Sequence, residues 1–196
     1  MIFKFNVEDF KASYVLKDIT KKFNGNVVLD NISLEMPEKG ILVISGYSGI
    51  GKTTFLRIMA NLIAPDSGER IGFDNKRIAY LFQEDRLLPW FDLLTNITCV
   101  LQGEDKEQKA KYWLDQVGLA NQYAKYPSEL SGGMKRRAAL ARMFAFGGDL
   151  YILDEPFKGL DKELKDRIIE ITKNACKGKM LVVVTHDKQE EDLLLK

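Results

Sequence analysis

The stretch that most restricts how this chain can fold is residues 41–54, with the sequence ILVISGYSGIGKTT. Its apolar start is typical of a strand buried on both faces of a parallel sheet. The following segment, TTFLRIMANLI, has helical spacing of its apolar residues, and Pro65 is expected to end that helix. Between them lies the pattern G-x-x-x-x-G-K-[ST], whose glycines let successive backbone amides face inward as a nest for an anion. This order of strand, loop and helix predicts an α/β fold with a phosphate-binding loop.

The same motif gives candidate nucleotide-binding residues. The Lys52 ammonium group can reach the β- and γ-phosphates, and the Thr53 hydroxyl can ligate Mg²⁺. A glycine turn that arises by chance is the alternative, but the strand and helix on either side favour a phosphate loop. The predicted binding residues of the loop are Gly46, Tyr47, Ser48, Gly49, Ile50, Gly51, Lys52, Thr53 and Thr54.

Two adjacent acids follow a second apolar run, at residues 151–155 (YILDE). A buried parallel strand delivers such residues to the carboxyl edge of the sheet, where ligands bind in open α/β folds. Asp154 would support Mg²⁺, and Glu155 would polarise an attacking water as general base. Taken alone, the acids could mark a strand that ends in a solvated turn, but the phosphate loop favours the catalytic interpretation.

The rest of the sequence alternates strands with helices and so indicates a parallel sheet in an α/β fold. Strands are predicted at 14–20, 26–36, 78–82 and 181–185, and helices at about 105–118, 131–146 and 160–175. The polar, helical character of about 85–135 predicts an inserted helical subdomain. A chain of 196 residues is expected to form a single domain over 1–196.

Composition narrows the function classes. The net charge of +1 predicts no nucleic-acid partner, and the basic cluster 135–137 is expected to be a solvated helix face. Cys99 and Cys176 are far apart and are expected to be reduced, small hydrophobes. No apolar segment approaches the ~20 residues that span a bilayer, and the N-terminus lacks the apolar core of a secretion signal. Any membrane-spanning helices are therefore expected in another chain.

Two further features are ambiguous by themselves. In SELSGGMKRR (128–137), Ser131 is a good N-cap, and the glycines leave amides free at the positive end of a helix dipole. Plain helix capping would explain that segment. The single histidine, His186, follows the apolar run LVVV, where a histidine is most often a hydrogen-bonded core residue at a strand end.

Together these motifs resemble the ATP-binding cassette family, the nucleotide-binding subunits of ABC transporters, over nearly the whole chain and in family order. The segments that correspond to its motifs are Walker A at 46–53, the signature at 130–134, Walker B at 150–155 and the D-loop at 159–161. The single residues that correspond are the Q-loop glutamine Gln83, the switch histidine His186 and the adenine-stacking aromatic Phe23.

The resemblance implies a P-loop NTPase core with a parallel sheet, an N-terminal antiparallel β subdomain and an inserted α-helical subdomain. It also implies ATP hydrolysis with Mg²⁺ as cofactor. The implied catalytic residues are Glu155, His186, Gln83 and Lys52, and the implied metal ligands are Thr53, Gln83 and Asp154. In an ATP-bound homodimer packed head to tail, the signature residues that act on the partner's site would be Ser131, Gly132, Gly133 and Met134, next to the D-loop residue Asp161.

The resemblance further implies that ATP-driven dimerisation moves separate transmembrane permease subunits, served by a solute-binding protein. The cassette would then be cytoplasmic and peripheral on the inner face of the membrane. The run FQEDRLLPW (82–90) is most similar to cassettes of nitrate, sulfonate and taurine importers. Its residues Leu87, Leu88 and Trp90 are expected either to form a groove for a coupling helix or to pack inside the helical subdomain.

Two positions depart from the family pattern. Met134 replaces the usual signature glutamine, as importers of this type often do, and Lys158 stands where a small residue usually precedes the D-loop. The residues after His186 allow little more than one helix, so no C-terminal regulatory domain is expected.

An ABC ATPase that acts on ribosomes or DNA is disfavoured by the single cassette without heptads or cysteine clusters. The signature and Walker B glutamate argue against a P-loop metabolic kinase.

Overall fold

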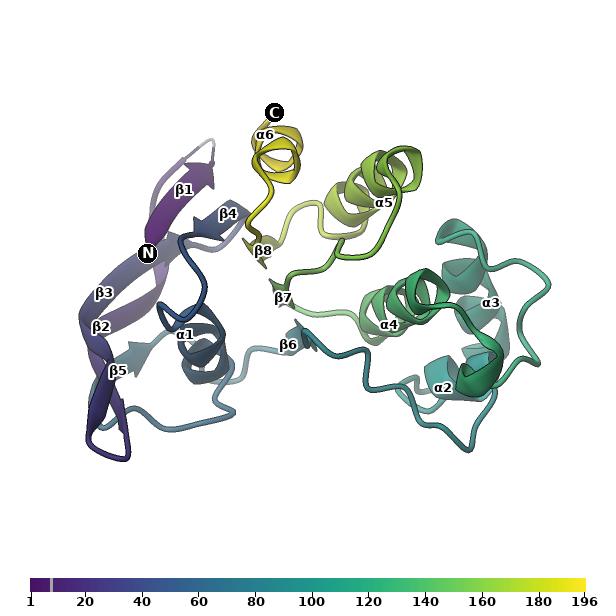
Figure 1. The fold of residues 1–196 in the computed structure, drawn as a ribbon, viewed down its shortest axis with the longest axis horizontal. Helices are drawn as coiled ribbons and strands as arrows, with labels where there is room; N and C mark the ends of the chain where they lie inside the picture. The colour runs from purple at the N-terminus through teal and green to yellow at the C-terminus, as the bar shows by residue number, and fades with distance from the viewer. Residues whose placement is uncertain (8) are drawn as a thin grey trace.

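A five-stranded sheet forms the centre of the computed structural model, which describes residues 1–7 and 9–196 (Figure 1). The strands lie in the order β1-β4-β8-β7-β6, and all except β1 run parallel. Their bounds are β1 Ile2–Asn6, β4 Gly40–Ser45, β6 Ile78–Leu81, β7 Leu150–Asp154 and β8 Met180–Val184. The predicted parallel sheet is confirmed.

Both faces of the sheet are covered at its inner strands β4, β8 and β7, which explains why these strands contain continuous apolar runs. On β8, Leu181 and Val183 pack in the cluster that contains residues of α4 and α5, whereas Val182 and Val184 pack in the cluster that contains residues of α1. The helices are α1 Lys52–Met59, α4 Gly132–Phe146, α5 Lys162–Ala175 and α6 Lys188–Leu195. The sheet therefore lies between two helical layers.

A second, antiparallel sheet lies beyond α1 and has the order β3-β2-β5 (Figure 1). Its strands are β2 Ala12–Phe23, β3 Asn26–Pro37 and β5 Ser67–Ile71. The β2–β3 hairpin turns at Asn24 and Gly25, with φ angles of 49° and 81°, as a two-residue type I′ turn requires. The turn sets Phe23 at the hairpin end. The antiparallel N-terminal sheet implied by the resemblance is present.

Helices occupy the opposite end of the molecule from the antiparallel sheet (Figure 1). They are α2 Leu93–Thr98, α3 Lys106–Gln116 and the short 3-10 helix η1 Pro127–Glu129, and α2 and α3 contact α4. Asn96 of α2 is fully buried, and its amide bonds the backbone of Leu88, Phe91 and Asp92. Cys99 after α2 is exposed, contrary to expectation, whereas Cys176 is buried. Within residues 1–7 and 9–196, no helix is long and apolar enough to cross a membrane.

The structure differs from the sequence prediction at several elements, among them the end of α1 and two strands that were not predicted. The helix α1 ends at Met59 and not at Pro65, because Asn61 adopts a left-handed φ of 59° and the Leu62 amide bonds back to the Arg57 carbonyl at 2.8 Å. The sequence pattern predicts no strand at Ile2–Asn6, which pairs antiparallel with β4 as β1, or at Ser67–Ile71, which forms β5. A five-residue edge strand of mixed polarity gives little sequence signal.

Candidate functional site

The phosphate loop connects β4 to α1 in a tight path. Gly51 caps the N-terminus of α1 with φ 95°, and a Cβ there would lie 2.9 Å from the Val28 carbonyl oxygen. The Lys52 ammonium donates to the carbonyls of Gly46 and Tyr47, both at 2.9 Å. Its burial lowers the pKa of Lys52, while Glu155 and Asp154 favour the charged form. The loop thus surrounds a fixed cation at a helix N-terminus, an arrangement that attracts anions.

Thr53, the next residue of α1, reaches the end of β7. Its hydroxyl donates to Asp154 Oδ2 at 2.7 Å. Asp154 is 1% exposed, and its other oxygen, Oδ1, has no hydrogen-bond partner among the described residues. Burial raises the pKa of Asp154, and the neighbouring Glu155 raises it further. A buried, unpaired carboxylate oxygen beside a hydroxyl fits a hard cation such as Mg²⁺.

Three side chains lie around the Glu155 carboxylate. Its Oε1 lies 2.9 Å from His186 Nε2, and its Oε2 accepts from Gln83 Nε2 at 3.3 Å. The Lys158 ammonium lies 3.5 Å from Oε2. Glu155 has a φ of 48°, which is costly for a residue other than glycine, and its amide donates to the Val184 carbonyl at 3.0 Å. The structure brings together three of the four predicted catalytic residues.

A cleft of about 550 Å³ opens over these groups. It is polar, and Ser48 of the phosphate loop shares it with the carboxyl edge of the sheet. The lining residues are Ser48, Gln83, Glu155, Lys158, Gly159, Lys165, Thr185, His186, Asp187 and Glu190. A phosphate chain held by the loop would therefore face the Glu155 carboxylate.

His186 is not a core histidine. Its side chain is 41% exposed, and it stands in the cleft between two anchored neighbours. The Thr185 hydroxyl donates to Glu190, and Asp187 caps α6. Lys165 of α5 lies 2.8 Å from Asp187 and 3.0 Å from Glu190. These contacts fix the backbone on both sides of the imidazole.

Phe23 lies at the end of the β2–β3 hairpin and is 46% exposed, with Lys21 Nζ 5.5 Å from its ring centroid. It does not line the cleft that contains Glu155. Tyr47 in the phosphate loop is 73% exposed. An exposed ring offers a face for stacking on adenine, so this contact stays a prediction.

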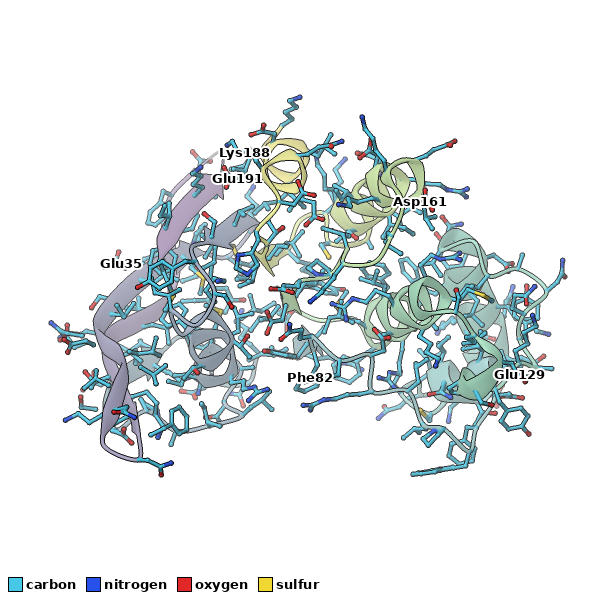
Figure 2. All side chains as sticks on the ribbon, in the orientation of Figure 1. Glu35, Phe82, Glu129, Asp161, Lys188 and Glu191 are labelled. Carbon is cyan, nitrogen blue, oxygen red and sulfur yellow. The ribbon has the colours of Figure 1, made fainter. Side chains whose placement is uncertain are left out.

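The signature segment lies apart from this cleft. The exposed Ser131 caps α4, and its hydroxyl accepts from the Met134 amide at 3.3 Å. Gly133 lies near the D-loop, since a Cβ there would be 3.5 Å from the Gly159 carbonyl oxygen. Asp161, labelled in Figure 2, caps α5. None of the signature residues lines the cleft over Glu155.

Arg136 is buried, contrary to the sequence prediction. The segment 135–137 was expected to be a solvated helix face, but Arg136 is 3% exposed. Its guanidinium donates to the carbonyls of Phe82, Gln83, Asp154, Glu155 and Pro156 and to the Asp85 carboxylate. The burial of Arg136 could have been predicted from its spacing. Ala139, Leu140 and Met143 follow it by three, four and seven positions, so all four residues share the buried face of the helix.

The sequence model of the family described as ABC transporter matches residues 29–158, which is more than half of the chain. This chain belongs to the ABC transporter family. The match includes the phosphate loop, Gln83, Ser131 and both acids of the Walker B segment.

The chain is similar to importer ATP-binding proteins and to a solved ATP-binding cassette. The aliphatic sulfonates import ATP-binding protein SsuB 1 of Paracoccus denitrificans is 37% identical over 185 residues, covering 91% of this chain and 75% of the relative. SsuB 1 of Mesorhizobium japonicum is 35% identical over 190 residues, with 92% and 72% covered. The dimeric structure of the ATP-binding cassette MJ0796 in a post-hydrolysis state bound to ADP and Pi is 27% identical, with a TM-score of 0.81 and coverage of 92% and 90%.

These findings confirm three predictions from the sequence. The fold is that of an ATP-binding cassette, the chain binds nucleotide, and its activity is that of an ABC transporter ATPase. The roles of individual site residues in this ABC transporter cassette rest on the geometry described above.

Proposed function

We propose that this cassette is the ATP-hydrolysing subunit of an importer, and that Glu155 is its general base. The observation that carries the proposal is the convergence of Gln83 and His186 on the Glu155 carboxylate, in a cleft shared with Ser48 of the phosphate loop. Lys52 and the loop amides would bind the phosphates, and His186 would contact the γ-phosphate. Glu155 would accept a proton from the attacking water.

The contacts of Glu155 also suggest how the resting site is controlled. Both oxygens have close nitrogen neighbours in this structure, since Oε1 lies beside His186 Nε2 and Oε2 accepts from Gln83 and lies near the Lys158 ammonium. We propose that nucleotide binding rearranges Gln83 and His186 around the carboxylate, which lines the open cleft, before an attacking water is positioned there.

Mg²⁺ is the cofactor that we propose, held by Thr53 and Asp154 with Gln83 as a further predicted ligand. The short Thr53–Asp154 contact and the unpaired Asp154 Oδ1, noted for the described part of the chain, support this assignment. The cation would neutralise phosphate charge when bound. Asp154 itself would contribute a buried negative charge that orients the Thr53 hydroxyl.

We propose that two copies close on ATP, each presenting Ser131, Gly132, Gly133 and Met134 to the other's nucleotide. The exposed N-terminus of α4, away from its own cleft, supports this arrangement. The MJ0796 cassettes are described as dimeric. A helix N-terminus with glycines can approach a phosphate closely.

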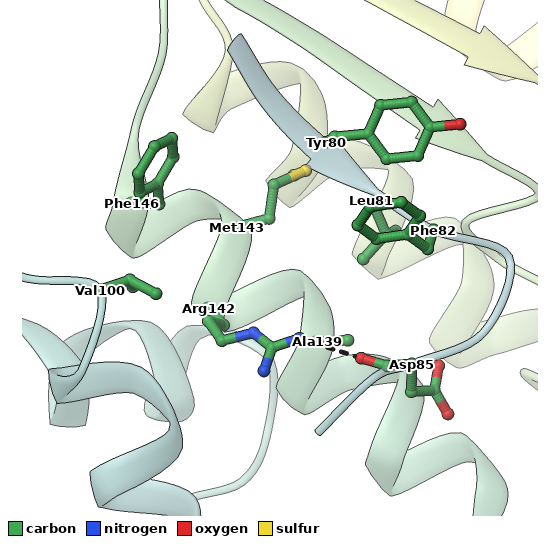
Figure 3. A pocket seen from close by; sticks show the side chains of 9 residues that line it. All are labelled: Tyr80, Leu81, Phe82, Asp85, Val100, Ala139, Arg142, Met143 and Phe146. Carbon is green, nitrogen blue, oxygen red and sulfur yellow. Dashed lines mark hydrogen bonds between the residues drawn. The ribbon is translucent and has the colours of Figure 1, made fainter. Parts of the chain in front are cut away.

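Separate membrane permease subunits and a solute-binding protein are the further partners that we propose, with the cassette on the inner face of the membrane. A cavity of about 220 Å³ beside the Q-loop supports a docking place for a permease segment (Figure 3). Its lining residues are Tyr80, Leu81, Phe82, Asp85, Val100, Ala139, Arg142, Met143 and Phe146. Of the residues first expected at such a groove, Leu87 packs against the helical core while Trp90 is 68% exposed.

Aliphatic sulfonates, named for two relatives, are the proposed solute class.

The substitution Glu155→Gln tests the proposal. We expect turnover to fall by about 10²–10⁴-fold, because a general base is lost while its shape and its contacts with Gln83 and His186 are largely kept. Binding of Mg-ATP should persist, and an ATP-dependent dimer should accumulate in size-exclusion chromatography. Glu84→Gln is the matched control, since Glu84 is exposed beside Gln83 but does not line the cleft. Near-normal hydrolysis by Glu155→Gln would remove the general-base role.

A further inference from the structure

The buried guanidinium of Arg136 joins three segments that the proposed mechanism uses separately. Arg136 lies on α4, five residues after the N-cap Ser131. Its acceptors lie in the segment around Gln83 and in the turn after β7. We propose that Arg136 is a positioning residue that sets Gln83 and Glu155 together and ties both to the signature end of α4. This inference rests on the proposed function.

The contacts with the turn after β7 fix the backbone that carries the general base. Arg136 Nη2 donates to the carbonyls of Asp154 and Glu155, both at 2.8 Å, and Nε donates to the Pro156 carbonyl at 2.9 Å. Glu155 is the residue with the left-handed φ of 48°. Such a conformation persists only where the surroundings over-determine it. Three bonds from one rigid fork supply that constraint.

The contacts with the Q-loop segment come from the remaining nitrogen. Arg136 Nη1 donates to the Phe82 carbonyl at 2.7 Å and lies 3.3 Å from both the Gln83 carbonyl and Asp85 Oδ1. The same guanidinium therefore holds the backbones of Gln83 and Glu155, whose side chains meet at 3.3 Å. Arg142, which lies further along α4, donates to the Asp85 carbonyl at 3.1 Å (Figure 3).

The number and arrangement of hydrogen-bond donors on Arg136 matter for this role as much as its charge does. A guanidinium has five N–H donors in a planar fork, whereas an ammonium has three donors at one point. The acceptors around Arg136 lie on two separate segments, so a lysine could satisfy only part of the set. When a partner engages Ser131 and shifts α4, Arg136 would carry the movement to Gln83 and Glu155 at the same time.

The test compares Arg136→Lys with Arg137→Lys. Arg137 donates to the carbonyls of Val117 and Gly118, both at 2.8 Å, and so uses the same chemistry inside the helical region without touching the cleft. For Arg136→Lys we expect kcat to fall by about 10–100-fold, because small displacements of catalytic groups have effects of this size. The KM for ATP should change by less than about 3-fold, since the phosphate loop is untouched. Arg137→Lys should keep kcat within about 2-fold.

A double-mutant cycle separates positioning from folding. If Arg136 acts through Glu155, Arg136→Lys should add almost nothing to the loss caused by Glu155→Gln. Losses that multiply in the double variant, or a fall in kcat that matches a fall in folded fraction, would overturn the proposal. Wild-type turnover by Arg136→Lys beside an inactive Glu155→Gln would overturn this inference alone, whereas an active Glu155→Gln would overturn the proposed function.

A second measurement needs no variant at position 136. Hydrogen exchange of the wild-type protein, with and without a non-hydrolysable ATP analogue, reports the protection of each segment. We expect the amides that follow Ser131, Gln83 and Glu155 to change protection at the same analogue concentration. Changes at Gln83 and Glu155 while the first turns of α4 stay unaltered would overturn the coupling.

Discussion

The carboxyl edge of the central sheet and the N-terminus of α4 differ in how far their polar side chains are paired with one another. At the sheet edge, Thr53 is paired with Asp154, and Glu155 is paired with Gln83 and His186. At α4, the Ser131 hydroxyl only caps its own helix, and the segment is exposed. We propose that the first region is an assembled site and that the second is half of a site, completed by the phosphate loop of a partner subunit. Each prediction below tests that difference.

The largest effect among changes outside the phosphate loop and the sheet edge should come from Ser131→Arg, which places a bulky cation at the N-terminus of α4. We expect the pure variant to lose about 10²-fold in turnover, comparable to the loss of one charge-stabilising donor. Mixing it with Lys52→Ala should restore hydrolysis, because the mixed dimer has one site with an intact phosphate loop and an intact signature. Steady-state ATPase assays at a fixed total concentration measure the rescue.

Lys52→Ala alone is the control for that mixture and should be inactive. If mixing gives only the average of the two inactive proteins, each signature serves its own chain, and the contrast between the two regions disappears.

A stability effect of intermediate size is expected for Asp154→Asn. Burial raises the pKa of Asp154, so the folded state holds this proton more tightly than the unfolded state does, and the contribution of the group to stability falls as pH rises through the folded pKa. Removing the buried charge at neutral pH should therefore stabilise the nucleotide-free protein by about 1 kcal/mol. Thermal unfolding should show a Tm about 2–4 °C higher, while ATPase activity is lost.

Asp161→Asn is the matched control, because Asp161 is an exposed N-cap and asparagine caps equally well. Its Tm should stay unchanged. A lower Tm for Asp154→Asn would mean that contacts in the folded state stabilise the charged carboxylate more than its unpaired oxygen indicates.

The smallest effect is expected for Lys158→Gly, at the segment between the two regions. The Lys158 side chain is 71% exposed and lies 3.5 Å from Glu155 Oε2. Exposed pairs contribute little, so basal turnover should change by less than about 3-fold. The difference from wild type should vanish at high ionic strength, which salt-dependent ATPase assays would measure. A change above about 10-fold that persists in salt would make Lys158 part of the catalytic machinery.

Features that depend on residues close in the chain could be predicted from the sequence. The phosphate loop, the two acids at the end of β7 and the N-caps Ser131 and Asp161 all follow from short motifs. The parallel sheet followed from continuous apolar runs. The interpretation of Leu87 and Trp90 remained open because groove and core packing demand the same residue types.

What could not be predicted depends on distant partners. The acceptors of Arg136 lie 18 to 54 positions away, so the local sequence 135–137 gave only a cluster of charges. The early end of α1 depends on the left-handed Asn61, a conformation that asparagine tolerates but does not require. The proximity of His186 and Glu155 needed the neighbouring strands β7 and β8, although the family motifs named both residues.

The two cysteines differ in a way that has a practical consequence. Cys99 is exposed at the end of α2, whereas Cys176 is 3% exposed and burial raises the pKa of its thiol. Thiolates are the reactive form, so a maleimide dye should attach to the helical region at a single place without any engineering. Energy transfer from that dye to a fluorescent nucleotide would follow, in real time, how far the helical region travels during each catalytic cycle.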